Sequence, residues 1–135
     1  MAWNEPKTNW VSTDYFNADD YNRVIGNLAY LKELADALFL HLIDVSLGEE
    51  KTYLSMIYAR EMNAIEESLA TLNLETYQFE LGETMTYRAN GSTPLWSELN
   101  RIESAIFLLY NTMTAHKAAL PRLELRLGNQ KGIKV

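Results

Sequence analysis

Apolar residues step alternately by three and four positions in three stretches of the chain, a pattern typical of helices in a bundle or coiled coil. The first stretch covers residues 18–47, where Asn17 can cap the N-terminus and Gly48 can end the helix. Asp19 and Asp20 favour the first turn, because carboxylates stabilise the positive end of the helix dipole. The predicted apolar face consists of Tyr21, Val24, Leu28, Leu31, Ala35, Leu38, Leu42 and Val45.

Two further helices are predicted from the same stepping. The second covers about residues 50–72, and so little chain separates it from the first that the two must form a hairpin or a bend at Gly48. The third starts with Thr93 as N-cap and Pro94 in the first helical position, and it ends before Pro121. Its apolar face consists of Leu95, Leu99, Ile102, Ile106, Leu109, Met113, His116 and Leu120.

The remaining parts of the chain are predicted to be extended. Tyr77, Phe79 and Leu81 alternate with polar residues, which allows a small β-hairpin between the second and third helices. Residues 1–17 and 121–135 form terminal arms that carry apolar anchors on either side of a helical bundle at residues 18–120. The predicted fold class is therefore all-α, with a bundle of three main helices and extended N- and C-terminal arms.

Composition limits the classes of partner. The 135 residues fit one domain with an ordinary hydrophobic content of 47%. A net charge of -6 disfavours nucleic acid, because binding to phosphates requires clustered Lys and Arg. The longest apolar run, residues 38–43, is far too short to cross a membrane, and no secretion signal starts the chain. We expect neither nucleic acid nor membrane as a partner, and synthesis in the cytoplasm.

No set of residues predicts an active site. His116 lies on an apolar helix face, and His41 with Asp44 could share a metal or a local hydrogen bond, but two ligands do not complete a site. Glu66 and Glu67 diverge by about 100° on a helix, so they are expected to lie on solvated faces. No nucleophile elbow or phosphate-binding loop is present. We expect no enzyme activity, no cofactor and no metal.

An internal repeat links the helices. Asp20-Tyr-Asn-Arg-Val24 aligns with Glu98-Leu-Asn-Arg-Ile102, and the apolar positions that follow stay in register. A weaker copy, Glu61-Met-Asn-Ala-Ile65-Glu, is either a third repeat or a chance likeness among heptads. In each Asn-Arg pair the amide can bind the backbone of an arm while the guanidinium pairs with a carboxylate. The alternative is a solvated Asn beside an Arg whose stem covers apolar surface.

Two segments carry a resemblance to a known group of proteins. Residues 10–28, Trp-Val-Ser-Thr-Asp-Tyr-Phe-Asn-Ala-Asp-Asp-Tyr-Asn-Arg-Val-Ile-Gly-Asn-Leu, and residues 95–103, Leu-Trp-Ser-Glu-Leu-Asn-Arg-Ile-Glu, resemble tail and baseplate proteins of phages that infect Gram-positive bacteria. The resemblance implies a structural component of the virion tail region, with other virion or tail proteins as partners. The alternative is a cytoplasmic helical adaptor, or an assembly or regulatory protein, that is absent from the finished particle.

Aromatic side chains and the Asn-Arg pairs are the candidate interaction residues. Large aromatic residues and Arg dominate binding hot spots, although the arms can instead fold back onto the ends of their own bundle. Three apolar seams in a chain with little else to cover them also predict self-association. The candidates are Trp3, Trp10, Tyr15, Phe16, Asn22, Arg23, Trp96, Asn100 and Arg101.

Overall fold

Three packed α-helices form the protein. The computed structural model describes residues 3–52, 56–89 and 94–134, and for residues 121–134 it describes the backbone alone. The helices are α1 (Ala18–Phe39), α2 (Ala59–Leu74) and α3 (Trp96–Lys134), and each packs against the other two. No strand occurs among the described residues. The predicted all-α fold with three main helices is confirmed.

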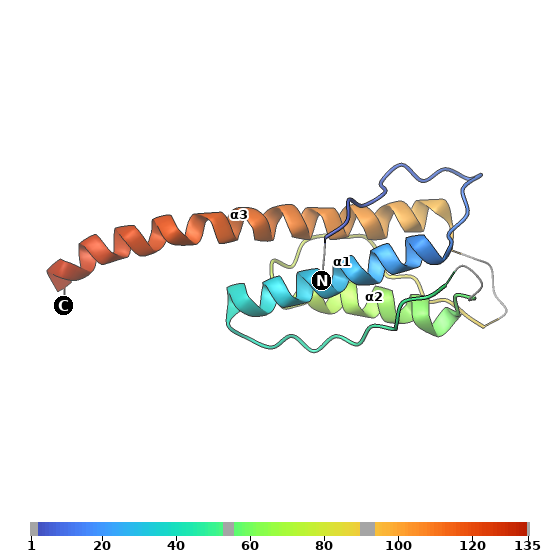
Figure 1. Ribbon diagram of the computed structural model, residues 1–135, viewed down its shortest axis with the longest axis horizontal. Coiled ribbons are helices and arrows are strands. Elements are labelled where there is room, and N and C mark those ends of the chain that lie inside the picture. The colour runs from blue at the N-terminus through green and yellow to red at the C-terminus, as the bar shows by residue number, and fades with distance from the viewer. Residues whose placement is uncertain (1–2, 53–55, 90–93, 135) are drawn as a thin grey trace.

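The three helices run in the same direction, so that all of them begin at one end of the bundle (Figure 1). Extended chain carries each connection back along the bundle, and the prediction of a hairpin or a bend at Gly48 is therefore wrong. We call the extended parts the first segment (residues 3–17), the second segment (40–52 and 56–58) and the third segment (75–89, 94 and 95). Each of them lies along a groove between two helices, as the contacts described below show.

α1 ends at Phe39 rather than at Leu47, because a side chain diverts the backbone. Leu40 adopts the left-handed conformation (φ 51°), and the Asp36 carboxylate accepts a hydrogen bond from the Ile43 N–H (2.8 Å). Ile43 consequently becomes buried, whereas the predicted seam residue Leu42 is 81% exposed. The second segment starts at this turn.

Gly48 has a different role from the predicted helix stop. A Cβ atom at this position would lie 2.6 Å from the Tyr21 hydroxyl, which is closer than real Cβ contacts allow. Glycine therefore lets the second segment pass directly over α1. α2 starts only at Ala59, later than predicted, and the Glu61 carboxylate accepts the Tyr58 N–H (2.8 Å) at its N-terminus.

The ends of α3 also differ from the prediction. The helix begins at Trp96, where the Leu99 N–H donates to the Leu95 carbonyl (3.0 Å), and the predicted cap Thr93 lies outside the described residues. Instead of ending before Pro121, the helix continues to Lys134, so the prediction of an extended C-terminal arm is wrong. The sequence after the proline, Arg-Leu-Glu-Leu-Arg-Leu, consists of strong helix formers, which favours resumption of the helix.

A single core fills the space between the helices. α1 contributes Leu28 and Leu31, and α3 contributes Ile106 and Leu109, all of them inaccessible to solvent. The third segment does not form the β-hairpin, because its backbone is bound by helix side chains: Asn73 binds both backbone groups of Phe79 (2.7 and 2.8 Å). The alternating apolar residues Tyr77, Phe79 and Leu81 pack against this core instead.

Candidate interaction surface

On each helix, the asparagine in the fifth position binds the backbone of an extended segment. The Asn100 amide donates to the Trp10 carbonyl (3.0 Å) and its oxygen accepts the Trp10 N–H (2.8 Å). We call this two-bond arrangement an asparagine clamp, and it pairs both polar groups of a residue that would otherwise be buried unpaired. The clamps at this repeated helix position are Asn22 on Lys51, Asn63 on Tyr87 and Asn100 on Trp10. Asn27 on Asn4 and Asn73 on Phe79 make the same two bonds at other positions and are not counted among these three clamps.

The clamps repeat with threefold pseudo-symmetry. Each asparagine is the fifth residue of its helix, and each clamped residue lies in the extended segment that leads into a different helix. The segment before α1 is held by α3, the segment before α2 by α1, and the segment before α3 by α2. The cycle is complete, so the weak third copy around Asn63 is a structural repeat of the other two.

Glu103 forms the best-satisfied polar cluster next to a clamp. Its carboxylate, 1% exposed, accepts two hydrogen bonds from the Arg23 guanidinium, both 2.8 Å long. The Trp10 indole N–H (2.6 Å) and the Lys7 backbone N–H (3.0 Å) provide two more donors. Arg23 also pairs with Asp20 at 2.9 Å. Four donors thus hold one buried carboxylate, which ties the first segment, α1 and α3 together.

Glu66 occupies the equivalent position on α2 but is held less completely. Its Oε2 atom accepts hydrogen bonds from Arg101 and from the Tyr87 hydroxyl, the latter at 2.9 Å. Its Oε1 atom is buried and has no hydrogen-bond partner among the residues described. Burial, and next the charge of Glu66, raises the pKa of Tyr87, so its hydroxyl remains a donor at neutral pH.

The repeat on α2 lacks the arginine that follows the clamping asparagine in the other two repeats. α2 carries Ala64 where the other two helices have Arg23 and Arg101, and Lys51 of the second segment pairs with Glu61 instead (2.9 Å). Burial acts to raise the pKa of Glu61, but the hydrogen bonds from Lys51 and the Tyr58 N–H outweigh it and lower the pKa. The repeat therefore keeps its asparagine clamp while its ion pairs vary.

The contacts of the Asn-Arg pairs follow the first of the two interpretations given above. Asn22 and Asn100 bind segment backbone, and Arg23 and Arg101 pair with buried carboxylates. The prediction that Glu66 lies on a solvated face is wrong, since the residue is 2% exposed. Its signal was present in the sequence, because an acid follows three positions after the asparagine in the second and third copies.

The aromatic candidates divide into two groups. Trp3 stacks on Tyr110 with ring centroids 3.8 Å apart, and Trp10 is 2% exposed and contacts Phe16. These side chains of the first segment cover their own bundle. Tyr15 and Trp96, by contrast, are 87% and 46% exposed, so these two remain available to a partner.

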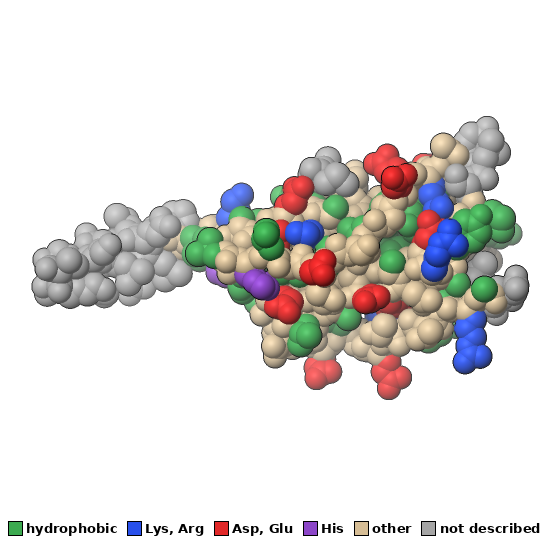
Figure 2. All heavy atoms as spheres, turned by 90° about the horizontal axis from the view of Figure 1, so that it is seen from below, with side chains coloured by type: hydrophobic (Ala, Val, Ile, Leu, Met, Phe, Trp, Pro, Cys, Tyr) green, Lys and Arg blue, Asp and Glu red, His purple; other side chains and the backbone are tan. Residues whose placement is uncertain are grey.

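A hollow of about 890 Å³ lies at the end of the bundle where the helices begin. We call it the end hollow. Its rim carries one exposed aromatic side chain from each repeat, namely Tyr15, Tyr58 and Trp96. Figure 2 shows hydrophobic side chains at this end, with basic side chains beside them. Exposed apolar surface around a concavity is typical of a protein-binding site. The other apolar lining residues include Phe16, Met56, Ile57, Met62, Leu95 and Leu99.

Two histidines lie outside the clamps. His41 lies 3.6 Å from Glu75, and it does not share a helix face with Asp44, because α1 ends at Phe39. His116 shares a hydrogen bond with the Tyr77 hydroxyl (2.9 Å). In the described part of the chain, no group of three or more His, Asp or Glu residues could hold a metal ion. Within the same residues, no helix is both long and apolar enough to cross a membrane.

Comparisons with known proteins add no relative. No protein family, no curated protein and no solved structure matches the chain.

Proposed function

We propose that the chain is a structural component of a phage tail, baseplate or tail-like particle, and that it works by packing against other protein surfaces. The observation that carries this proposal is that, among the described residues, no other element covers two features at opposite ends of one bundle. The end hollow with its three rim aromatics occupies one end. The free part of α3 extends from the other (Figure 1).

α3 extends well beyond its partner helices. His116 contacts Phe39, the last residue of α1, with ring centroids 5.5 Å apart. The helix then continues to Lys134. At 1.5 Å per residue, these last residues add roughly 27 Å of helix without α1 or α2 beside it. A helix of this kind gains most of its stability by packing on another surface, which favours a partner protein at this end.

The internal polar contacts favour a building block of fixed shape. Three asparagine clamps and the Glu103 and Glu66 clusters fix the segments between the helices. The residues responsible include Trp10, Asn22, Arg23, Asn100 and Arg101, which belong to the two segments that resemble phage tail and baseplate proteins. The resemblance thus falls on the residues that define this architecture, and it supports a place in the virion tail region after synthesis in the host cytoplasm.

The test is the composition of purified particles. Quantitative mass spectrometry should find the chain in a fixed ratio to the major tail protein, and gold-labelled antibodies should bind at the tail. Particles that contain no copy of the chain, from cells that express it, would overturn the proposal. That result would instead support a helical adaptor, or an assembly or regulatory protein, that leaves before the particle is complete.

A further inference from the structure

The end hollow combines apolar surface with two arginines that form no ion pair in the described structure. Its charged lining residues are Asp14, Arg60 and Arg88. The Asp14 charge is met by Lys7 at 3.2 Å, whereas neither arginine forms an ion pair with another residue that the structure describes. Both arginines are exposed. In a chain with a net charge of -6, this end is therefore suited to an acidic partner segment that also carries an apolar side chain.

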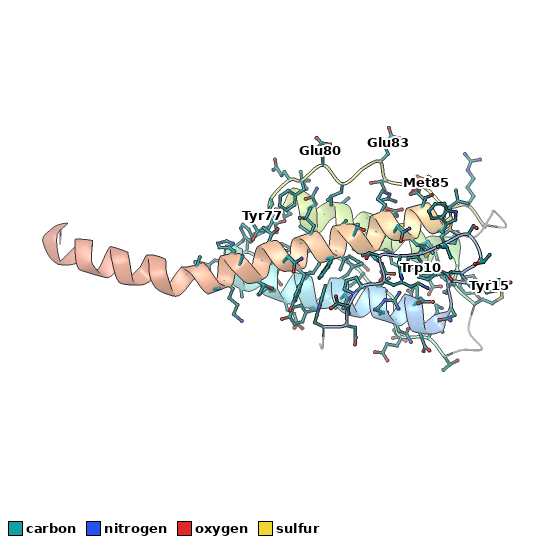
Figure 3. The ribbon with its side chains drawn as sticks, turned by 90° about the horizontal axis from the view of Figure 1, so that it is seen from above. Trp10, Tyr15, Tyr77, Glu80, Glu83 and Met85 are labelled. Carbon is teal, nitrogen blue, oxygen red and sulfur yellow. The ribbon has the colours of Figure 1, made fainter. Side chains whose placement is uncertain are left out.

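The chain has such a segment on its own surface. Residues 80–85, Glu-Leu-Gly-Glu-Thr-Met, follow the end of α2 in the third segment, and we call them the ridge. Glu80 and Glu83 are exposed and point away from the helices, and Met85, 40% exposed, lies nearer the end hollow (Figure 3). The ridge thus presents two carboxylates and one flexible apolar side chain, which complement the two arginines and the apolar lining of the end hollow.

The ridge cannot reach the hollow of its own molecule. Asn73 binds both backbone groups of Phe79 at one end of the ridge, and Asn63 binds both backbone groups of Tyr87 beyond the other. Gly82 lies between them with φ +84°, and a Cβ atom there would be 2.9 Å from the Arg101 side chain. The ridge is therefore fixed along the side of the bundle, and only another molecule can receive it.

We infer that the end hollow binds the ridge of a second copy of this chain. Arg60 and Arg88 pair with Glu80 and Glu83 of the second copy, and Met85 enters between the rim aromatics, where thioether and ring contacts are favourable. Each copy then offers its hollow to one neighbour and its ridge to another. Such a head-to-tail contact builds a ring if its rotation closes and a filament if it does not.

This inference deepens the proposed function by naming one partner, and it rests on that function only for the use of the contact within a particle. Light scattering on the purified full chain should give masses above 15.5 kDa that fall on dilution. High salt should weaken the association, because exposed ion pairs are screened. A mass of 15.5 kDa at roughly 100 µM protein in low salt would overturn the inference.

Charge reversal identifies the two surfaces. The double variants Arg60→Glu/Arg88→Glu and Glu80→Arg/Glu83→Arg should each raise the dissociation constant at least about tenfold, because like charges then face each other. An equimolar mixture of the two variants should associate again, because each negative hollow meets a positive ridge. Glu49→Arg/Glu50→Arg, two exposed acids of the second segment, is the matched control and should leave association unchanged.

The folding of each variant is checked by circular dichroism and thermal melting, since all four substituted positions are exposed. Association that survives both reversals, or a mixture of folded variants that stays monomeric, would overturn the inference. The particle composition described above can still be positive in that case, so failure of this contact and failure of the proposed function are distinguishable.

Discussion

Glu103 and Glu66 occupy equivalent positions, three residues after a clamping asparagine, yet their surroundings differ. Both oxygens of Glu103 accept two hydrogen bonds each. In Glu66 only Oε2 is bound, and Oε1 has no hydrogen-bond partner in the described structure. The difference arises in the arginines and in the extended segments. Arg23 donates Nε and Nη2 to Glu103, whereas Arg101 donates only Nη2 to Glu66 and its Nε to Glu98. The Lys7 N–H, three residues before the clamped Trp10, reaches Glu103, whereas Thr84, three residues before the clamped Tyr87, makes no such bond to Glu66.

The same fold thus accommodates one buried carboxylate with all its hydrogen bonds made and another with one oxygen unbound. Glu66 and Thr84 both line a space of about 390 Å³ beside the third segment, and this looser packing accounts for the missing donor from the segment. The asparagine clamp, which needs only one side chain and the backbone, is present in all three repeats. The carboxylate cluster depends on the path of a segment and on the direction of the arginine, and it is complete only at Glu103.

The largest expected effect is at Glu103. Glu103→Gln places an amide NH2 against two hydrogen-bond donors in either orientation and leaves Arg23 with only Asp20 as a charged partner. We expect a loss of about 3 to 5 kcal/mol in the free energy of unfolding, as for other broken buried ion pairs. Urea denaturation measures it. Glu67→Gln on an exposed face of α2 is the control, and an equal small loss in both variants would contradict the interpretation.

The clamps should have intermediate effects of similar size. Replacement of Asn100, Asn63 or Asn22 by Ala removes two hydrogen bonds and leaves a backbone N–H and a carbonyl without their partner, which costs about 1 to 3 kcal/mol. Hydrogen exchange gives a local readout, because the amide of the released residue, Tyr87 in the Asn63→Ala variant, should lose protection. Asn111→Ala at an exposed position of α3 should change neither quantity. Unaltered protection of Tyr87 would show that the segment is held by other contacts.

The smallest effect is expected at Glu66. In Glu66→Gln the amide NH2 can occupy the position of Oε1, which has no donor in the structure, while the amide oxygen keeps the hydrogen bonds from Tyr87 and Arg101. The loss should be about 1 kcal/mol, because only the charge assistance of these bonds disappears. Urea denaturation of Glu66→Gln and Glu103→Gln side by side measures the difference between the two positions. A loss as large as that at Glu103 would mean that the two positions are energetically alike.

The sequence was sufficient for features that depend on local physical chemistry. Helical periodicity gave the all-α class, and the N-terminus of α1 was predicted correctly, because Asn17 and Asp20 form reciprocal capping bonds over a few residues. The end of α1 was not predictable, since it depends on the hydrogen bond that the Asp36 carboxylate accepts from the Ile43 N–H. The parallel direction of the helices was also missed. Periodicity identifies an apolar face, and it does not determine the path of an extended connection.

The candidate residues show the same division. The repeated Asn-Arg pairs were found because two sequence copies agreed at matched positions, and the structure gives both pairs equivalent contacts. Glu66 was missed, because an adjacent pair of acids by itself does not indicate which one faces inward; only its alignment with Glu103, three positions after Asn100, distinguishes it. The end hollow is formed by three chain regions far apart in sequence. Of its three rim aromatics, Tyr15 and Trp96 were predicted as interaction residues, and Tyr58 was not.

The cyclic arrangement of the clamps has a consequence for the order in which the chain folds. The hydrogen bonds of Trp10 form only after Asn100, 90 positions later, has been synthesised, and those of Arg23 only after Glu103, 80 positions later. Most small helical proteins fold fast through contacts between neighbours in sequence, whereas distant contacts slow the search. At ordinary rates of translation, synthesis of the residues between Trp10 and Asn100 takes roughly 5 to 20 s, and during this time the first segment has no α3 to bind. This all-helical chain should therefore complete its native structure only near the end of synthesis, with the slow kinetics more familiar from β-proteins.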